Sequence, residues 1–134
     1  STDLRSKLAR AKGLGSAHHG VEHWWWQRVT AVALVPLSVW FLYSLITVML
    51  TPDVTHVAVW LATPFNALAM VLMLVAGLFH AKLGAQVVIE DYIKPPYAKY
   101  TLLLLNTFVC GIFAVIGIVA ILKLHFLDIT SAAL

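Results

Sequence analysis

Three long runs of apolar residues dominate the pattern of the chain. They cover residues 24–50, 64–92 and 97–124. Each run is longer than the about 20 apolar residues that a helix needs to cross the core of a bilayer. Residues 54–62 form a shorter segment, whose apolar positions recur at the spacing of one helix face: Val54, Val57, Ala58 and Leu61. The pattern predicts an all-α integral membrane protein with three transmembrane helices and a short interfacial segment between the first two.

Proline residues mark where the predicted helices bend, begin or end. Pro36 lies inside the first run, where it removes a backbone hydrogen-bond donor, and we expect a bend there. Thr63 is predicted as the N-cap of the second helix and Pro64 as its first helical residue. The pair Pro95 and Pro96 ends that helix and precedes the third.

Basic residues are concentrated on one side of the predicted membrane. Residues 1–23 form a basic tail, separate from the three-span anchor of residues 24–134, and the connection at 90–99 is also basic. Seven lysines and arginines fall on this side: Arg5, Lys7, Arg10, Lys12, Arg28, Lys94 and Lys99. One, Lys123, falls on the other side. Because an excess of lysine and arginine marks the cytoplasmic side of a membrane protein, we expect the N-terminus on the cytoplasmic or matrix side.

The composition excludes several other classes of protein. The chain is 61% hydrophobic and 11% charged, which leaves too little polar surface for a soluble domain of 134 residues. The net charge of +3 is too small and too localised to indicate binding to nucleic acid. The single cysteine, Cys110, excludes an intrachain disulfide and a thiolate metal site of the usual spacing.

His80 is the main candidate for chemistry because it lies deep in the second run. An ionisable residue at that depth costs about 2–3 kcal/mol or more and is a functional candidate. The alternative is a neutral histidine that bonds a neighbouring helix. Gly77 and Gly84 fall on the same helix face as His80, one turn before and after it. Glycines there would clear a groove for a porphyrin, so the pattern favours a heme ligand.

A heme with two histidine ligands needs both at one depth in the membrane. The other histidines lie at or beyond the ends of the predicted spans: His18, His19, His23, His56 and His125. None of them matches His80 in depth. If His80 binds heme, its partner ligand must come from another chain.

Glu90, Asp91 and Tyr92 end the second predicted helix. Two acidic residues at a helix C-terminus oppose the helix dipole and cost about 0.3–1 kcal/mol each, and such a violated local rule points to function. A phenol at Tyr92 can donate a hydrogen bond to a quinone carbonyl, while Asp91 can orient a base or pass protons. Quinone reduction needs both. The alternative is that Tyr92 is an interfacial anchor and Asp91 a solvated helix end.

The sequence from His80 to Tyr92 resembles the signature of the small, D-type membrane anchor subunit of succinate dehydrogenase. That pattern has a histidine, a glycine four residues later, and an Asp-Tyr pair eleven and twelve residues after the histidine, as at His80, Gly84, Asp91 and Tyr92. The resemblance extends to the basic tail, to an arginine near the start of the first span, to the three spans and to the Lys-Pro that follows the Asp-Tyr pair. It covers essentially the whole chain.

The resemblance implies a role for each candidate residue. His80 would be an axial ligand of heme b, Tyr92 a hydrogen-bond donor to the quinone, and Asp91 its supporting or proton-relay partner. Arg28 would lie near a heme propionate or the quinone pocket, unless it is an interfacial arginine whose charge reaches the headgroups. His23 is a candidate for a propionate contact, although its spacing to Arg28 departs from the family's arrangement.

By the same resemblance, the chain is a subunit of respiratory complex II that has no catalytic activity alone. It would anchor the flavoprotein and iron–sulfur subunits, pair with a second three-span anchor of the C-type, share one heme b with it and help to reduce ubiquinone. The expected location is a bacterial inner membrane with a cytoplasmic N-terminus, in preference to the mitochondrial inner membrane. Two alternatives stay open: the anchor of a fumarate reductase-type complex, and a heme-free scaffold in which His80 only pairs helices.

Overall fold

The computed structural model describes residues 17–50 and 53–127. In these residues the chain forms helices α2 (Ala17–Met49), α3 (Val54–Ala62), α4 (Pro64–Tyr92) and α5 (Pro96–His125). By length and composition, α2, α4 and α5 can each cross a membrane. The predicted all-α fold, with three spans and a short helix between the first two, is confirmed. Most of the predicted basic tail lies outside the described residues.

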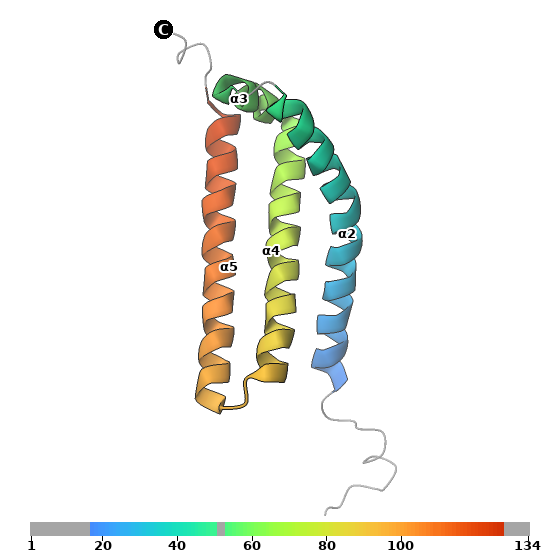
Figure 1. The fold of residues 1–134 in the computed structure, drawn as a ribbon, viewed down its shortest axis with the longest axis vertical. Helices are drawn as coiled ribbons and strands as arrows, with labels where there is room; N and C mark the ends of the chain where they lie inside the picture. Colours follow the sequence, from blue (N-terminus) through green and yellow to red (C-terminus); the bar gives the residue numbers. More distant parts are fainter. Residues whose placement is uncertain (1–16, 51–52, 128–134) are drawn as a thin grey trace, which may run out of the picture.

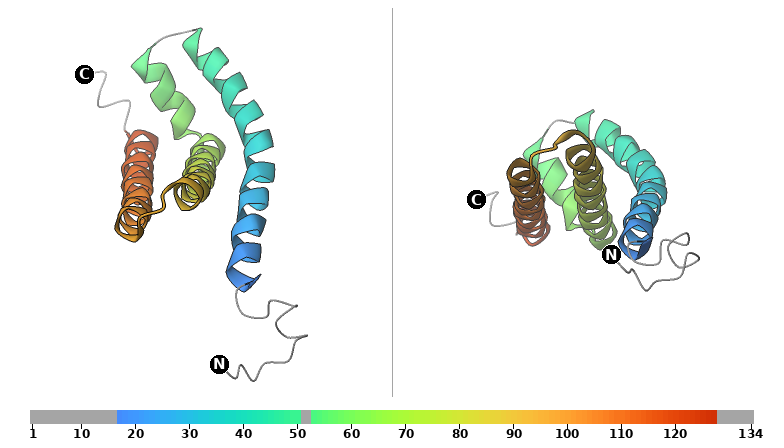
Figure 2. Two further views of the ribbon diagram at one scale, coloured as in Figure 1. Left: turned by 60° about the horizontal axis from the view of Figure 1, so that its bottom comes forward. Right: turned by 90° about the horizontal axis from the view of Figure 1, so that it is seen from below.

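α4 is the central helix of the molecule. Figure 1 shows it between α2 and α5, and the view from below in Figure 2 shows the same curved row of three helices. α4 contacts both of its neighbours, and α3 lies across one end of the row against α4 and α5. Because the row is not closed into a bundle, each of the three long helices keeps a face that the chain itself does not cover.

The helix ends agree with most of the predicted boundaries. α3 occupies the predicted segment, α4 ends at Tyr92 as predicted, and α5 extends slightly beyond both predicted ends. α2 differs, since it begins at Ala17 rather than at Trp24. The apolar run marks where a helix can enter a membrane, whereas the polar residues before it continue the same backbone hydrogen bonds.

The N-termini of α3 and α4 differ in how their free backbone N–H groups are satisfied. Asp53 caps α3, because its carboxylate accepts a hydrogen bond of 3.0 Å from the backbone N–H of Thr55. Thr63 occupies the predicted N-cap of α4, followed by Pro64, but its side chain makes no capping hydrogen bond. Thr63 also ends α3 in an extended conformation. Thr63 therefore forms the corner between α3 and α4. Pro64 has no backbone N–H, so α4 has one donor fewer for a capping side chain to accept from.

α2 is curved along its length, as Figure 1 shows, and Pro36 lies within it. A proline inside a helix lacks the N–H that would bond the preceding turn, and its ring crowds the carbonyl of that turn. The predicted bend agrees with this curvature.

A small apolar core forms where α3 crosses the ends of α4 and α5. Leu61, Ala67 and Ile121 are buried together there. His125 strengthens the junction, because its Nδ1 lies 2.7 Å from the carbonyl oxygen of Leu61. A carbonyl oxygen only accepts, so the imidazole N–H donates. Of the predicted apolar stripe of α3, Ala58 and Leu61 are buried and Val57 packs against this core, whereas Val54 is exposed.

Gly117 allows α5 to approach α4 closely. A Cβ built at this position would overlap the side chain of Leu74 on α4. A Cβ at Gly111, on the same helix, would meet nothing within 4 Å in the described chain. Small residues are common where membrane helices approach each other, since packing rather than the hydrophobic effect holds them together.

The variant Gly117→Ala is expected to destabilise the chain by about 1–3 kcal/mol, because Leu74 must leave its packed position. Gly111→Ala is the matched control. It is expected to be neutral or to stabilise α5 by about 0.5–1 kcal/mol, since alanine favours a helix over glycine. Thermal unfolding in detergent, followed by the helical circular dichroism signal, compares the two. Equal melting temperatures would show that Leu74 moves aside without cost.

Apolar side chains remain exposed along the whole length of the long helices. None of the most apolar stretch of α5 is buried within the chain. Large side chains on this helix, such as Phe108, Ile112 and Ile116, are exposed. Contiguous apolar surface of this extent needs lipid or a partner chain against it.

Candidate functional site

His80 lies near the middle of α4 and faces α2. It lies about 24 Å of helix after Pro64 and about 18 Å before Tyr92. The imidazole is half-buried, and its Nδ1 lies 3.0 Å from the Oγ1 of Thr30 on α2. This is a contact between polar groups of two helices at a depth where the surrounding side chains are apolar.

Thr30 lies on the face of α2 that meets α4. Helical periodicity puts His23, Gln27, Thr30 and Leu34 on this one face. Thr30 is buried, and its Oγ1 lies 2.7 Å from the carbonyl oxygen of Trp26 and 3.2 Å from that of Gln27. The hydroxyl therefore donates to the backbone of the preceding turn, as threonines inside helices commonly do.

The second ring nitrogen of His80 is available to a group outside the chain. Within the described residues, two buried side-chain atoms lack a hydrogen-bond partner, His23 Nε2 and Gln27 Oε1. His80 Nε2 is not one of these two atoms. Within the described chain, the imidazole of His80 forms its hydrogen bond with Thr30 through Nδ1. Nε2 is therefore not fully enclosed by the described chain.

Gly77 and Gly84 both lie near α2, and Gly77 also lines an apolar groove of about 440 Å³. A Cβ on Gly77 would lie 3.9 Å from Cδ2 of Leu34, and one on Gly84 would lie 3.7 Å from Nε2 of Gln27. These distances are ordinary van der Waals contacts, and Gly77 borders a groove together with Phe41 and Met73, so the expectation that the glycines clear space for a porphyrin stays a prediction. Glycines beside a polar residue also serve the packing of membrane helices, and the two uses give the same pattern in a sequence.

Glu90, Asp91 and Tyr92 complete α4 and are all exposed. Gln86 donates a hydrogen bond of 2.9 Å from Nε2 to Oε1 of Glu90, one turn later. Tyr92 is 78% exposed, so its phenol is open to a ligand or a partner chain. These residues lie about 15–18 Å from His80 along the helix. The candidate site thus has two separate parts on one helix.

Arg28 and His23 lie near the start of α2 and differ in access. The guanidinium carbon of Arg28 lies 5.3 Å from the ring centroid of Trp24, a cation–π contact, and the residue is exposed. His23 is half-buried, and its Nε2 is enclosed. Arg28 can therefore reach a group outside the chain, whereas His23 can do so only through its other ring nitrogen.

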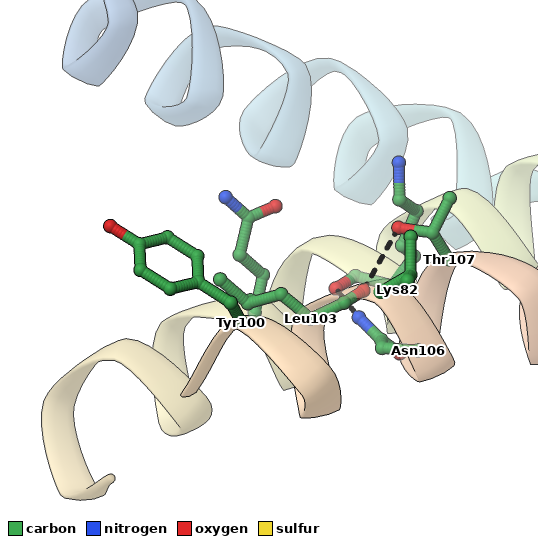
Figure 3. Close-up of a pocket in the computed structure, with 7 residues that line it drawn as sticks. Lys82, Tyr100, Leu103, Asn106 and Thr107 are labelled. Atoms are coloured by element: carbon green, nitrogen blue, oxygen red, sulfur yellow. Dashed lines mark hydrogen bonds between the residues drawn. The ribbon is translucent and has the colours of Figure 1, made fainter. Parts of the chain in front are cut away.

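A groove of about 470 Å³ opens between α4 and α5, as Figure 3 shows. Its lining consists of Lys82, Gln86, Tyr100, Leu103, Leu104, Asn106 and Thr107. Asn106 donates from Nδ2 to the carbonyl oxygen of Lys82 at 3.0 Å, and Thr107 donates to that of Leu103 at 3.1 Å. These bonds hold the groove's polar side chains to the backbone. None of the candidate heme or quinone residues belongs to the lining.

The residues around His80 fit one half of a heme site. The ligand of heme iron is a neutral imidazole nitrogen, and the other ring nitrogen of a metal-bound histidine usually donates a hydrogen bond. Nε2 and Nδ1 of His80 match these two requirements. Across residues 17–50 and 53–127, no three His, Cys, Asp or Glu side chains lie together as a metal-binding group.

Thr30 and Gln27 are the residues of this site that the sequence reasoning missed. Threonine is an ordinary residue in a membrane helix, and neither its spacing nor its neighbours distinguish it. The depth of Thr30 was the usable signal: it lies 13 residues after Ala17, while His80 lies 12 residues before Tyr92. Antiparallel packing of α2 and α4 brings two such positions to the same level. The start of α2 had to be known first.

Comparison with known proteins gives a consistent result over most of the chain. The model of the succinate dehydrogenase/fumarate reductase transmembrane subunit family matches residues 2–114. The succinate dehydrogenase hydrophobic membrane anchor subunit of Rickettsia conorii is 38% identical to the chain over 120 residues, which cover 89% of this chain and 94% of the relative.

Two further relatives carry the same description. The succinate dehydrogenase hydrophobic membrane anchor subunit of Rickettsia bellii is 37% identical over 119 residues, covering 88% of this chain and 90% of its own length. That of Paracoccus denitrificans is 33% identical over 84 residues, covering 63% of this chain and 64% of the relative. The similarity therefore includes all three membrane-length helices in the longer matches.

Proposed function

We propose, because the chain belongs to the family of succinate dehydrogenase/fumarate reductase transmembrane subunits, that it supplies one axial ligand of heme b and part of a ubiquinone reduction site. The chain is a membrane anchor subunit of succinate dehydrogenase and a multi-pass membrane protein of the respiratory chain. It is thus part of the complex II assembly. The proposal concerns what its side chains do there.

The observation that carries the heme proposal is the arrangement of the two ring nitrogens of His80. Nδ1 is engaged by Thr30, whereas Nε2 is not fully enclosed by the described chain. A histidine that only paired α2 with α4 would leave Nε2 without a partner in an apolar medium, which is unfavourable. Heme b, when bound, accepts and donates single electrons. The protein's part would be to hold the heme through Nε2 of His80 and to orient the ring through Nδ1.

The second axial ligand is expected from a C-type, three-span anchor. His23, His56 and His125 lie at the ends of the helices or in α3, away from the depth of His80. The exposed apolar faces of the three long helices provide the surface for such a partner. One heme b would then be shared between two anchor chains.

Tyr92 and Asp91 are proposed to form part of the quinone site. Reduction of ubiquinone to ubiquinol takes two electrons and two protons, and the electrons come from the iron–sulfur subunit of the complex. The phenol O–H of Tyr92 donates a hydrogen bond to a quinone carbonyl oxygen as negative charge develops on it. Asp91, the preceding residue, supports that donor or passes a proton toward it. Both side chains are exposed at the end of α4.

Arg28 is proposed as a contact for a heme propionate or the quinone pocket. Its exposed guanidinium, beside Trp24, is a suitable donor for a carboxylate from outside the chain. His23 is a weaker candidate for the propionate, since its Nε2 is enclosed and only its Nδ1 could serve.

The proposed partners are the flavoprotein and iron–sulfur subunits on the N-terminal side, the C-type anchor within the membrane, and lipid. The excess of lysine and arginine on the N-terminal side supports a cytoplasmic N-terminus in a bacterial inner membrane. Succinate is oxidised in the flavoprotein subunit, so this chain alone has no catalytic activity.

A redox difference spectrum of the purified complex, together with its subunit masses, tests the proposal. We expect four subunits and one b-type heme per complex. A complex with full succinate oxidation but no Soret band would instead support the heme-free scaffold. If the co-purified quinone is a low-potential quinone rather than ubiquinone, the fumarate reductase-type alternative gains support.

A further inference from the structure

The Thr30 hydroxyl determines which nitrogen of His80 carries the hydrogen. A threonine hydroxyl has one hydrogen to donate and lone pairs with which to accept. The carbonyl oxygens of Trp26 and Gln27 can only accept, and the former lies 2.7 Å from Thr30 Oγ1. The hydroxyl hydrogen is therefore directed at Trp26. Toward His80 Nδ1, at 3.0 Å, the Thr30 oxygen can only accept.

We infer that Thr30 is a positioning residue for His80: its hydroxyl, held by the Trp26 carbonyl, accepts the Nδ1–H and fixes the tautomer with a lone pair on Nε2. In the opposite tautomer Nε2 would carry the hydrogen and could not bind a metal ion. The inference rests on the proposed function only for the identity of the group that Nε2 meets.

The apolar surroundings make this hydrogen bond more stabilising than the same bond would be on a surface exposed to water. Thr30 is 7% exposed, and both residues lie in the apolar middle of long membrane helices. Water does not compete well for polar groups there, so an Nδ1–H without an acceptor would be unfavourable. The same bond sets the orientation of the ring, because Thr30 is anchored to the backbone of α2.

The hydrogen bond from His80 Nδ1 to Thr30 would also affect the reduction potential of a bound iron. A histidine that donates from its second nitrogen is a more basic ligand. A more basic ligand stabilises the ferric over the ferrous state and so lowers the reduction potential. Loss of the acceptor at Thr30 is therefore expected to raise the reduction potential of the heme.

The test compares whole purified complexes that each carry one of four single substitutions in this chain. Thr30→Val keeps the shape but removes the acceptor, Thr30→Ala removes it without adding bulk, and Thr30→Ser keeps the hydroxyl. Thr47→Val is the matched control on the same helix, since the Thr47 hydroxyl donates to the Ser44 carbonyl at 2.8 Å. Subunit masses and succinate oxidation with a soluble acceptor verify assembly.

The valine and alanine variants are expected to bind heme about 10- to 100-fold more weakly. The retained heme should have a higher reduction potential and shifted g values in its low-spin ferric resonance. The serine variant and Thr47→Val should match the unchanged complex. The inference is overturned if Thr30→Val behaves as Thr47→Val does, or if Thr30→Ser is altered as much as Thr30→Val.

These outcomes are distinct from failure of the proposed function. If His80→Ala itself leaves the low-spin heme signal unchanged, His80 is not a ligand and the proposed function fails. If His80→Ala abolishes the signal while every Thr30 variant keeps the normal potential and resonance, the ligand assignment holds and only the role of Thr30 fails.

Discussion

Replacing His80 with alanine is expected to remove the low-spin heme b signal from the assembled complex. Without the imidazole, the proposed heme would keep only the ligand expected from the partner anchor. Because loss of merely a supporting hydrogen bond to a metal ligand lowers affinity about 10- to 100-fold, loss of the ligand should lower heme content at least as much. Reduced-minus-oxidised spectra, normalised to the flavin of the complex, measure the change.

His56→Ala is the matched control for this substitution. His56 is exposed on α3 and lies at the far end of the molecule from the middle of α4. Its removal should leave the heme spectrum intact. An unchanged low-spin spectrum in the His80 variant, with all subunits present, would contradict ligation and leave the histidine as a contact between α2 and α4.

Replacing Tyr92 with phenylalanine is expected to slow quinone reduction about tenfold to a hundredfold, the range for loss of one hydrogen bond to a developing charge. The side chain is exposed and ends α4, so the change removes one hydroxyl and little packing. Succinate oxidation with an artificial soluble acceptor bypasses the quinone and should stay normal. The ratio of the two rates is the measured quantity.

Tyr97→Phe serves as the control for a boundary tyrosine without a proposed role. Tyr97 lies in the first turn of α5 and is 90% exposed. Its variant should keep both rates. Equal loss of both rates in the Tyr92 variant would point to faulty assembly, and unchanged rates would make Tyr92 an interfacial anchor only.

The three spans could be predicted from the sequence because one physical requirement governs them. A helix in a bilayer must be apolar over its whole length, so the runs alone fixed the helix type and most boundaries. The start of α2 could not be found this way, since it begins at Ala17 in a polar segment. Backbone hydrogen bonds continue beyond the membrane, and no apolar run records them.

The site could be predicted only in part, because single positions are identifiable but pairs across helices are not. His80 was conspicuous as an ionisable residue in an apolar run. Its partner Thr30 was not, since a threonine is inconspicuous and the relative level of α2 and α4 depends on where each begins. Gly77 lies near Leu34 of α2 and also lines an apolar groove, and whether that groove holds a cofactor stays a prediction.

The central claim is that His80 binds iron through Nε2 while Nδ1 contacts Thr30. A cryo-electron microscopy map of the purified complex, at a resolution that defines side chains, tests it most directly. We expect continuous density from the imidazole to the iron of a heme, a histidine of the second anchor on the opposite side, and the Thr30 hydroxyl beside Nδ1. A ring of His80 that lies against lipid, or a heme held entirely by other residues, would contradict the claim.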